Sequence, residues 1–179
     1  NFIFYINQLI ILVIIRSYAF IFLDLTVKYE GFSLNKEAKY ILISNHYSKL
    51  DTFIVLAFIP FKQFLNSLPF TALIADIYLE KFYLRYFILY LCGCVSTDIN
   101  RNNGVKPLEK IKNFIDQGRT PLIFPEGIMN KTGKFDNSIK LGVGAVYLER
   151  NNPDLYLIPV KIEYLDKRKV KITYKKPFR

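Results

Sequence analysis

The sequence is poor in the side chains that form disulfides and bind metal ions. Its 179 residues include one histidine, His46, and two cysteines, Cys92 and Cys94. Two cysteines separated by one residue make neither a disulfide framework nor a Cys-x-x-Cys redox pair, and they are too few for a structural zinc site. We therefore predict two buried apolar cysteines, a domain in a reducing, cytoplasmic environment, and no metal site.

Several functional signatures are missing as well. The sequence has no Gly-x-Ser-x-Gly elbow, the turn that carries the nucleophile of many hydrolases. It has no recognition-helix pattern, zinc-finger spacing or RNA-binding strand signature. These absences argue against a serine hydrolase and against a nucleic-acid partner.

Apolar residues and positive charge are the two things that the chain has in excess. Hydrophobic residues make up 51% of the sequence, and the formal net charge is +10. Most of the positive excess lies after residue 97, and it is densest in residues 161–179. A chain that is both oily and basic predicts membrane phospholipid as a partner. A solvated basic face is the alternative for residues 161–179.

The longest apolar stretch lies at the amino terminus, where Arg16 is the only charged residue between positions 2 and 23. A helix of this length spans about 33 Å, close to the roughly 30 Å of a bilayer's hydrocarbon core. Arg16 weakens a simple membrane-spanning interpretation. The stretch therefore spans the membrane, lies on it, or forms a buried core helix. We assign residues 1–24 to a hydrophobic membrane anchor.

The rest of the chain, residues 25–179, has the length of one domain. The sequence starts at Asn1, and its only methionine is Met129, so we expect the true start of the protein to be missing. Apolar runs and amphipathic segments alternate, which indicates an α/β fold. Residues 61–75 read as apolar and irregular. Strands are expected at 40–44, 93–97, 121–124, 155–162 and 169–174, and helices at 49–59, 78–91, 106–117 and 139–150.

His46 lies in a polar segment directly after the predicted strand at 40–44. Segments that follow buried strands in α/β proteins often carry functional residues. Asp51 comes five residues later, and on one continuous helix the two side chains would diverge by about 140°. If His46 lies in a turn and Asp51 begins the next helix, the ring can fold back onto the carboxylate. Such a pair is typical of a general base oriented by an aspartate, with a purely structural histidine as the alternative.

A second polar position follows the predicted strand at 121–124. Glu126 stands between Pro125 and Gly127. This arrangement either pre-positions a carboxylate for a functional role or simply makes a turn.

Two charged residues, Asp98 and Arg101, follow the predicted strand at 93–97. The forked donors of the Arg101 guanidinium suit a phosphate group, and a surface turn explains the segment equally well. The apolar segment Ile158-Pro159-Val160 is, taken alone, typical of a structural strand.

These segments, in this order, resemble the glycerolipid acyltransferase family, which includes glycerol-3-phosphate and 1-acylglycerol-3-phosphate acyltransferases. The resemblance runs over residues 25–175. The matching blocks are Asn45, His46 and Asp51 in an Asn-His-x4-Asp pattern, then Phe124, Pro125, Glu126 and Gly127, and last Ile158, Pro159 and Val160.

Two segments depart from the family pattern. Residues 96–97 stand where an aromatic or apolar pair is usual, and Arg101 comes two places late after Asp98. Residues 128–129 follow Phe-Pro-Glu-Gly where the family often has threonine. Both segments are implicated in binding the acceptor's phosphate, so the identity of the acceptor stays open. The lysines that could supply positive charge there are Lys131, Lys134 and Lys140.

The resemblance implies that His46, oriented by Asp51, takes the proton from an acceptor hydroxyl. The acceptor is most directly 1-acylglycerol-3-phosphate, which becomes phosphatidic acid, and the donor is acyl-CoA or acyl carrier protein (acyl-ACP). No other cofactor is implied. The residues to which the resemblance assigns substrate binding are Asn45, Asp98, Arg101, Phe124, Pro125, Glu126, Gly127 and Lys134.

We therefore predict a single α/β domain with a mixed, mostly parallel sheet flanked by helices, preceded by a hydrophobic N-terminal helical anchor. The predicted function is that of a membrane-associated O-acyltransferase at the cytoplasmic face. The alternatives are an acyltransferase for another lipid acceptor, such as a sugar lipid or an amine-bearing lipid, a non-catalytic membrane-binding protein, and a thioesterase or lipid hydrolase.

Overall fold

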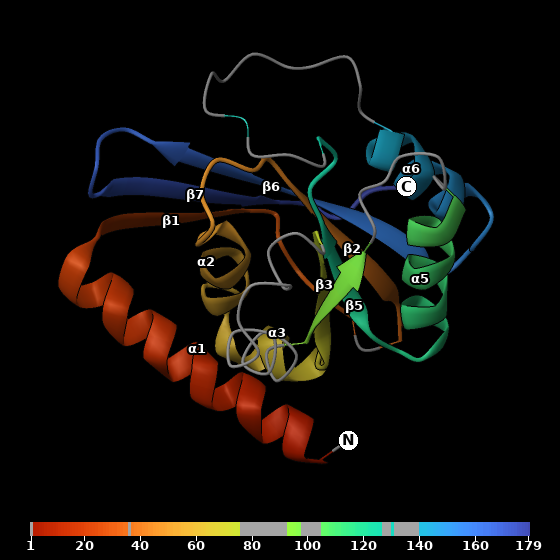
Figure 1. Ribbon diagram of the computed structural model, residues 1–179, viewed down its shortest axis with the longest axis horizontal. Helices are drawn as coiled ribbons and strands as arrows, with labels where there is room; N and C mark the ends of the chain where they lie inside the picture. Colours follow the sequence, from red (N-terminus) through yellow and green to blue (C-terminus); the bar gives the residue numbers. More distant parts are fainter. Residues whose placement is uncertain (1, 36, 76–92, 98–104, 127–129, 131–139) are drawn as a thin grey trace.

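A seven-stranded sheet with helices on both faces organises the chain (Figure 1). The computed structural model describes residues 2–35, 37–75, 93–97, 105–126, 130 and 140–179. Its helices are α1 (Phe2–Phe22), α2 (Asp51–Ala57), α3 (Phe61–Asn66), α5 (Val105–Asp116) and α6 (Lys140–Arg150). Its strands are β1 (Asp24–Glu30), β2 (Lys39–Ser44), β3 (Phe70–Ala75), β4 (Cys94–Thr97), β5 (Thr120–Ile123), β6 (Leu155–Tyr164) and β7 (Lys169–Lys175).

The strand order across the sheet is β1-β7-β6-β2-β5-β3-β4. Strands β6, β2, β5, β3 and β4 are parallel to their neighbours in this series, and β7 returns antiparallel to β6. Edge strand β1 runs parallel to β7. The predicted α/β class, with a mixed and mostly parallel sheet flanked by helices, is confirmed.

Two hydrophobic cores fill the two faces of the sheet. Helices α1, α2 and α3 pack on one face, where they contribute Leu12, Ile54 and Phe64 to the larger core. Helices α5 and α6 pack on the other face, where Ile111 and Leu148 join the smaller core. Because both faces of the central strands are covered, these strands read as apolar runs with no clear alternation.

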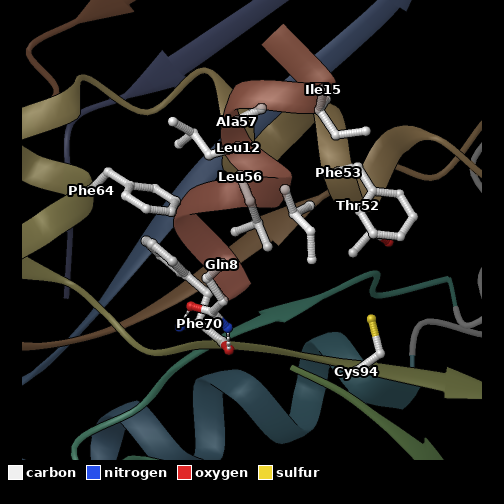
Figure 2. A pocket seen from close by; sticks show the side chains of 11 residues that line it. Gln8, Leu12, Ile15, Thr52, Phe53, Leu56, Ala57, Phe64, Phe70 and Cys94 are labelled. Atoms are coloured by element: carbon white, nitrogen blue, oxygen red, sulfur yellow. Dashed lines mark hydrogen bonds between the residues drawn. The ribbon is translucent and has the colours of Figure 1, made fainter. Parts of the chain in front are cut away.

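Helix α1 is held against the domain along one face by polar as well as apolar contacts. The Gln8 side chain donates a hydrogen bond to the Phe70 carbonyl (2.7 Å) and accepts one from the Phe70 N–H (3.1 Å), as Figure 2 shows. Leu12 and Ala19 are buried. Arg16 donates to the carbonyls of Ala57 and Ile59 at the end of α2, at 2.7 and 2.9 Å.

The opposite face of α1 exposes large apolar side chains. By length and composition, Tyr5–Phe22 could cross a membrane. The exposed side chains of this face include Ile10, Val13, Ile14, Phe20 and Ile21. The helix is therefore neither a free anchor nor a fully buried core helix.

Most of the predicted elements are present, with two corrections. The segment expected to be irregular, residues 61–75, instead forms α3 and β3. Strand β3 lies between β4 and β5, so its apolar run has no period by which the sequence could reveal it. Strand β1 was not expected, because it is an edge strand with charged and largely exposed residues. The predicted helix at 78–91 lies outside the described residues, as does Cys92, while Cys94 is buried as expected.

We predict that replacing Gln8 with leucine loosens the docking of α1. The change leaves the buried N–H and carbonyl of Phe70 without the partners that Gln8 supplies, which costs about 2 kcal/mol of unfolding free energy. Urea unfolding in detergent, followed by circular dichroism, measures the loss. Gln117→Leu, at an exposed position after α5, is the matched control and should leave the midpoint unchanged. Equal stability of the two variants would contradict the docking role of Gln8.

Candidate active site

The candidate site lies where two neighbouring strands end. Strands β2 and β5 are adjacent and parallel, with Ile43 paired to Ile123. The carboxyl ends of parallel strands meet at one edge of a sheet, which is the usual place for ligands in open α/β folds. The segment that follows β2 carries His46, and the segment that follows β5 carries Glu126. The two polar blocks recognised in the sequence therefore begin side by side.

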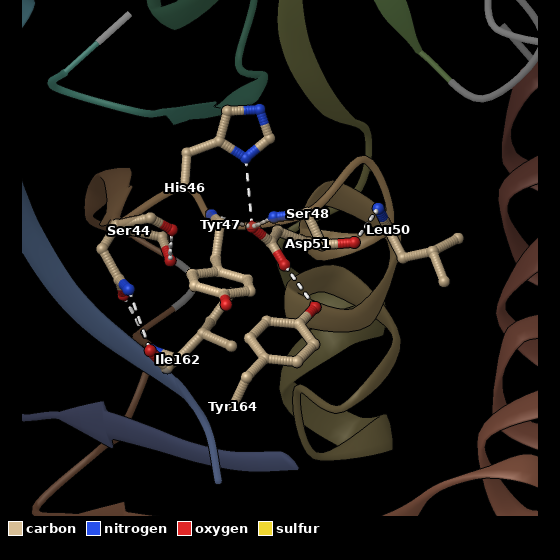
Figure 3. A network of polar contacts seen from close by, with 9 residues as sticks. Ser44, His46, Tyr47, Ser48, Leu50, Asp51, Ile162 and Tyr164 are labelled. Atoms are coloured by element: carbon tan, nitrogen blue, oxygen red, sulfur yellow. Dashed lines mark hydrogen bonds and ion pairs between the residues drawn. The ribbon is translucent and has the colours of Figure 1, made fainter. Parts of the chain in front are cut away.

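His46 and Asp51 form a hydrogen-bonded pair, as Figure 3 shows. The distance from the His46 Nδ1 to the Asp51 Oδ2 is 3.1 Å. His46 lies in the turn after β2, and Asp51 is the first residue of α2, which is the arrangement that lets the ring fold back. An ionised carboxylate only accepts hydrogen bonds, so this contact suits the neutral imidazole tautomer that has its proton on Nδ1 and its acceptor at Nε2. The pair can therefore present a base to a third group.

Asp51 is completely buried, and four groups among the described residues hydrogen-bond to its carboxylate. Its Oδ2 accepts from the N–H groups of Tyr47 and Ser48, at 2.5 and 2.7 Å, in addition to the His46 ring. Its Oδ1 accepts from the Tyr164 hydroxyl at 2.6 Å. A buried carboxylate stays ionised at low cost only when it is hydrogen-bonded in this way. The position of Asp51 at the start of α2 adds the favourable field of a helix amino terminus.

Asn45 fixes the turn that carries His46. Its side-chain amide donates to the Ile162 carbonyl and its Oδ1 accepts from the Ile162 N–H, both at 2.8 Å. The β2–β6 ladder ends at the pair Ser44 and Val160, so Ile162 lies beyond it. An amide has one donor side and one acceptor side, as a peptide group does, so Asn45 continues the ladder by one step. Asn45 therefore supports the turn from the sheet.

Two more contacts set the position of the His46 ring and backbone. The ring stacks on Phe124, with centroids 4.1 Å apart and planes inclined by 19°. The His46 carbonyl accepts a hydrogen bond from the Asn130 N–H at 2.7 Å. The side chain of His46 is 18% exposed, so its free edge can be reached from outside. The Phe-Pro-Glu-Gly block thus contributes the stacking partner of the histidine.

Glu126 lies partly buried after β5, two residues beyond Phe124. Its Oε2 is buried and has no hydrogen-bond partner within the described ranges. Buried polar atoms are nearly always paired, so an oxygen in this state calls for a donor from outside this set of residues. Pro125 precedes it in the same turn and is also partly buried.

Four of the predicted substrate-binding residues, Asp98, Arg101, Gly127 and Lys134, lie outside the described residues, and their roles stay predictions. Over the part of the chain that the structure describes, no group of three or more His, Cys, Asp or Glu side chains could hold a metal ion.

An apolar pocket lies between helices α1, α2 and α3 and strands β3 and β4 (Figure 2). Its empty volume is about 390 Å³, part of it open to solvent. Thr52 and Phe53, the two residues that follow Asp51, belong to its wall. The other lining residues come from α1, α2, α3, β3 and β4, and are Gln8, Ile11, Leu12, Ile15, Leu56, Ala57, Phe64, Phe70 and Cys94.

Sequence reasoning missed Tyr164. It lies at the end of β6, far along the chain from Asp51, and its hydroxyl reaches the carboxylate only because β6 outruns β2. The signal available was its spacing from Ile158-Pro159-Val160. A residue four places beyond Val160 on the same strand lies on the same face of the sheet.

Two comparisons with known proteins bear on the family and the fold of the chain. The Acyltransferase family model matches residues 26–163. The fold is similar to that of the 1-acyl-sn-glycerophosphate (LPA) acyltransferase PlsC from Thermotoga maritima, with a TM-score of 0.58 and 21% sequence identity. That match covers 91% of this chain and 64% of the Thermotoga chain, so this chain spans less than two thirds of its length. On the family match, which extends over most of its residues and includes both polar blocks, the chain belongs to the Acyltransferase family.

Proposed function

We propose that this protein transfers a fatty acyl group from a thioester to the hydroxyl of a glycerolipid precursor. The observation that carries the proposal is the His46–Asp51 pair, held at 3.1 Å at the end of β2 in a chain of the Acyltransferase family. The donor would be acyl-CoA or acyl-ACP. The acceptor would be 1-acylglycerol-3-phosphate, and the product phosphatidic acid.

The chemistry follows from the orientation of the imidazole. The Asp51 carboxylate holds the proton on Nδ1, so Nε2 takes the proton of the acceptor hydroxyl. The acceptor oxygen attacks the thioester carbonyl carbon, and a C–O bond forms. When the tetrahedral intermediate collapses, the C–S bond breaks and the thiol leaves with the proton from the imidazolium. Backbone N–H groups near Gly127 would stabilise the oxyanion, in line with the large electrostatic contribution usual in acyl transfer.

The apolar pocket supports an acyl substrate. Its wall begins at Thr52 and Phe53, directly after Asp51, so a chain that fills it would place its carbonyl end near the dyad. The lining of this pocket is almost entirely apolar, which suits a hydrocarbon group. We propose that the acyl chain of one substrate lies between α1, α2 and β3.

Glu126 and nearby charged residues would hold the acceptor head group. The buried Oε2 of Glu126, for which the described residues supply no hydrogen-bond partner, suits a hydroxyl donor of the acceptor. Arg101 and Lys134 would bind its phosphate, and Asp98 would orient Arg101. The departures from the family pattern around Asp98 and after Gly127 keep a different head group, such as that of a sugar lipid or an amine-bearing lipid, as the alternative acceptor.

We predict that His46→Ala and Asp51→Asn each lower the rate of acyl transfer by about 10²–10⁴-fold, the usual range for a positioned general base. The measurement is acceptor-dependent thiol release from an acyl-CoA, with glycerol 3-phosphate, 1-acylglycerol-3-phosphate and a glycolipid compared as acceptors. Asp154→Asn, at an exposed position before β6, is the matched control and should retain full activity.

Each alternative has its own result in this assay. Thiol release without acceptor would indicate a thioesterase. Undiminished transfer in both variants would exclude the proposed dyad. Lipid binding without any thiol release would indicate a non-catalytic membrane protein.

We also propose that α1 lies along the membrane surface and does not cross it. Gln8, Leu12, Arg16 and Ala19 fasten or bury one face of α1 at successive turns, so the helix cannot leave the domain without breaking these contacts. The outward face is apolar, as is typical of helices that lie in the interface of a bilayer. The basic character of the chain favours anionic lipid, and the expected location is the cytoplasmic face of a membrane.

We predict that the double substitution Ile10→Gln and Ile14→Gln weakens binding to vesicles of phosphatidylcholine and phosphatidylglycerol by at least about tenfold, because two large apolar contacts with lipid are lost. Vesicle flotation measures the binding. The matched control replaces Tyr147 and Leu165, exposed apolar residues on other elements, with glutamine and should bind as the wild type does. Labels at Ile10 and Phe20 should also report the same shallow depth with brominated lipids, whereas a spanning helix would place them at different depths.

A further inference from the structure

Of the hydrogen-bond partners that the described residues give Asp51, Tyr164 alone comes from a distant part of the chain. It is the last residue of β6, whereas Tyr47, Ser48 and His46 all lie within five residues of Asp51. Its hydroxyl lies 2.6 Å from the Asp51 Oδ1, on the oxygen that His46 does not use (Figure 3). His46 thus contacts one carboxylate oxygen of Asp51, and Tyr164 contacts the other.

The Tyr164 ring is held in place independently of this bond. It stacks on the ring of Tyr47 with centroids 4.8 Å apart and planes inclined by 23°. Tyr164 lies two residues beyond Ile162, whose backbone is clamped by Asn45. The hydroxyl therefore meets Asp51 in one fixed direction.

Toward Asp51 the hydroxyl acts as a donor. Burial raises the pKa of Tyr164, and the hydrogen bond to the Asp51 carboxylate raises this pKa further. The phenol consequently keeps its proton at any pH at which the enzyme works, and it donates to Asp51 throughout.

A buried aspartate beside a histidine creates a difficulty for a general base. The negative charge favours the imidazolium form, whereas a general base must start in the neutral form. Each hydrogen bond donated to the carboxylate draws off part of this charge. Two of the donors are backbone N–H groups that no side-chain change can remove, and the third is Tyr164.

From this geometry we propose that Tyr164 is a positioning residue for acyl transfer, which acts through Asp51 to keep the His46 ring neutral and correctly oriented. The inference rests on the proposed function for its catalytic meaning. Among the described residues, the titratable groups near the pair include Tyr47, stacked on Tyr164, Glu126, two residues beyond the Phe124 ring that stacks on His46, and Lys49, two residues before Asp51.

The direction of the effect follows from charge sharing. When Tyr164→Phe removes the donor, more of the carboxylate charge faces His46, and the imidazolium form is stabilised. The titration midpoint of the ring should therefore rise, by roughly half a pH unit to one unit. The acid limb of the kcat/KM profile should move to higher pH by the same amount, so that the variant loses most activity below neutral pH and regains much of it above.

The chain has a single histidine, so the midpoint can be measured without any substrate. We propose a titration of the ¹H–¹³C imidazole signals of the full chain in detergent, which come from His46 alone. Wild type, Tyr164→Phe and Tyr174→Phe are compared. Tyr174 is the matched control, because its buried hydroxyl also donates into α2, to the Val55 carbonyl at 2.5 Å, but does not touch Asp51.

A double-mutant cycle tests whether the effect passes through Asp51. In the Asp51→Asn background, Tyr164→Phe should no longer move the midpoint, because the charge that it shares is gone. An upward shift in Tyr164→Phe, absent in Tyr174→Phe and absent in the Asp51→Asn background, is the expected result.

Several results would overturn the inference. They are an unchanged or lowered midpoint in Tyr164→Phe, an equal shift in Tyr174→Phe, and a loss of activity that is the same at every pH. Unfolding on removal of this one oxygen would show a structural role instead. Because the titration needs no turnover, a shift seen in a protein that releases no thiol would refute the proposed function and leave the coupling of Tyr164 to His46 standing.

Discussion

A fully buried carboxylate, that of Asp51, is the constraint around which this site is built. A lone charge in a protein interior is costly, and the cost falls only when donors surround it. Here the donors come from the turn after β2, which includes the His46 ring, and from the far end of β6. Asp51 itself lies at the start of α2. Satisfying one side chain therefore ties together three parts of the chain, and the histidine is oriented as a consequence.

The length of β6 is what makes this possible. Strand β6 has ten residues and continues past the point where its pairing with β2 ends. The extension supplies Ile162 to Asn45 and the Tyr164 hydroxyl to Asp51. Strand β7 pairs antiparallel with this same extension and keeps it rigid. The turn that carries His46 is thus fastened to the sheet, as a pre-organised site requires.

Helix α1 has two apolar faces that contact different surroundings. Its inner face walls the apolar pocket that opens beside Thr52, and its outer face exposes large apolar side chains. Under the proposed function, a lipid substrate would move along this helix from the membrane toward the His46–Asp51 pair through apolar surroundings. Gln8 and Arg16, two polar residues within the apolar stretch, attach the helix to the domain.

The sequence by itself determined the α/β class, most of the strands and helices, the family, and the pairing of His46 with Asp51, because periodicity and short-range spacing are local properties. It did not reveal β1, α3 or β3, since an exposed edge strand and an apolar stretch interrupted by Pro69 carry no distinctive period. Only the tertiary structure decided three sets of contacts. They are the contacts of Gln8 and Arg16 with the domain, those of Asn45 with Ile162, and the hydrogen bond of Tyr164 to Asp51. Each joins residues more than 40 positions apart, and which of them meet depends on strand order and on the length of β6.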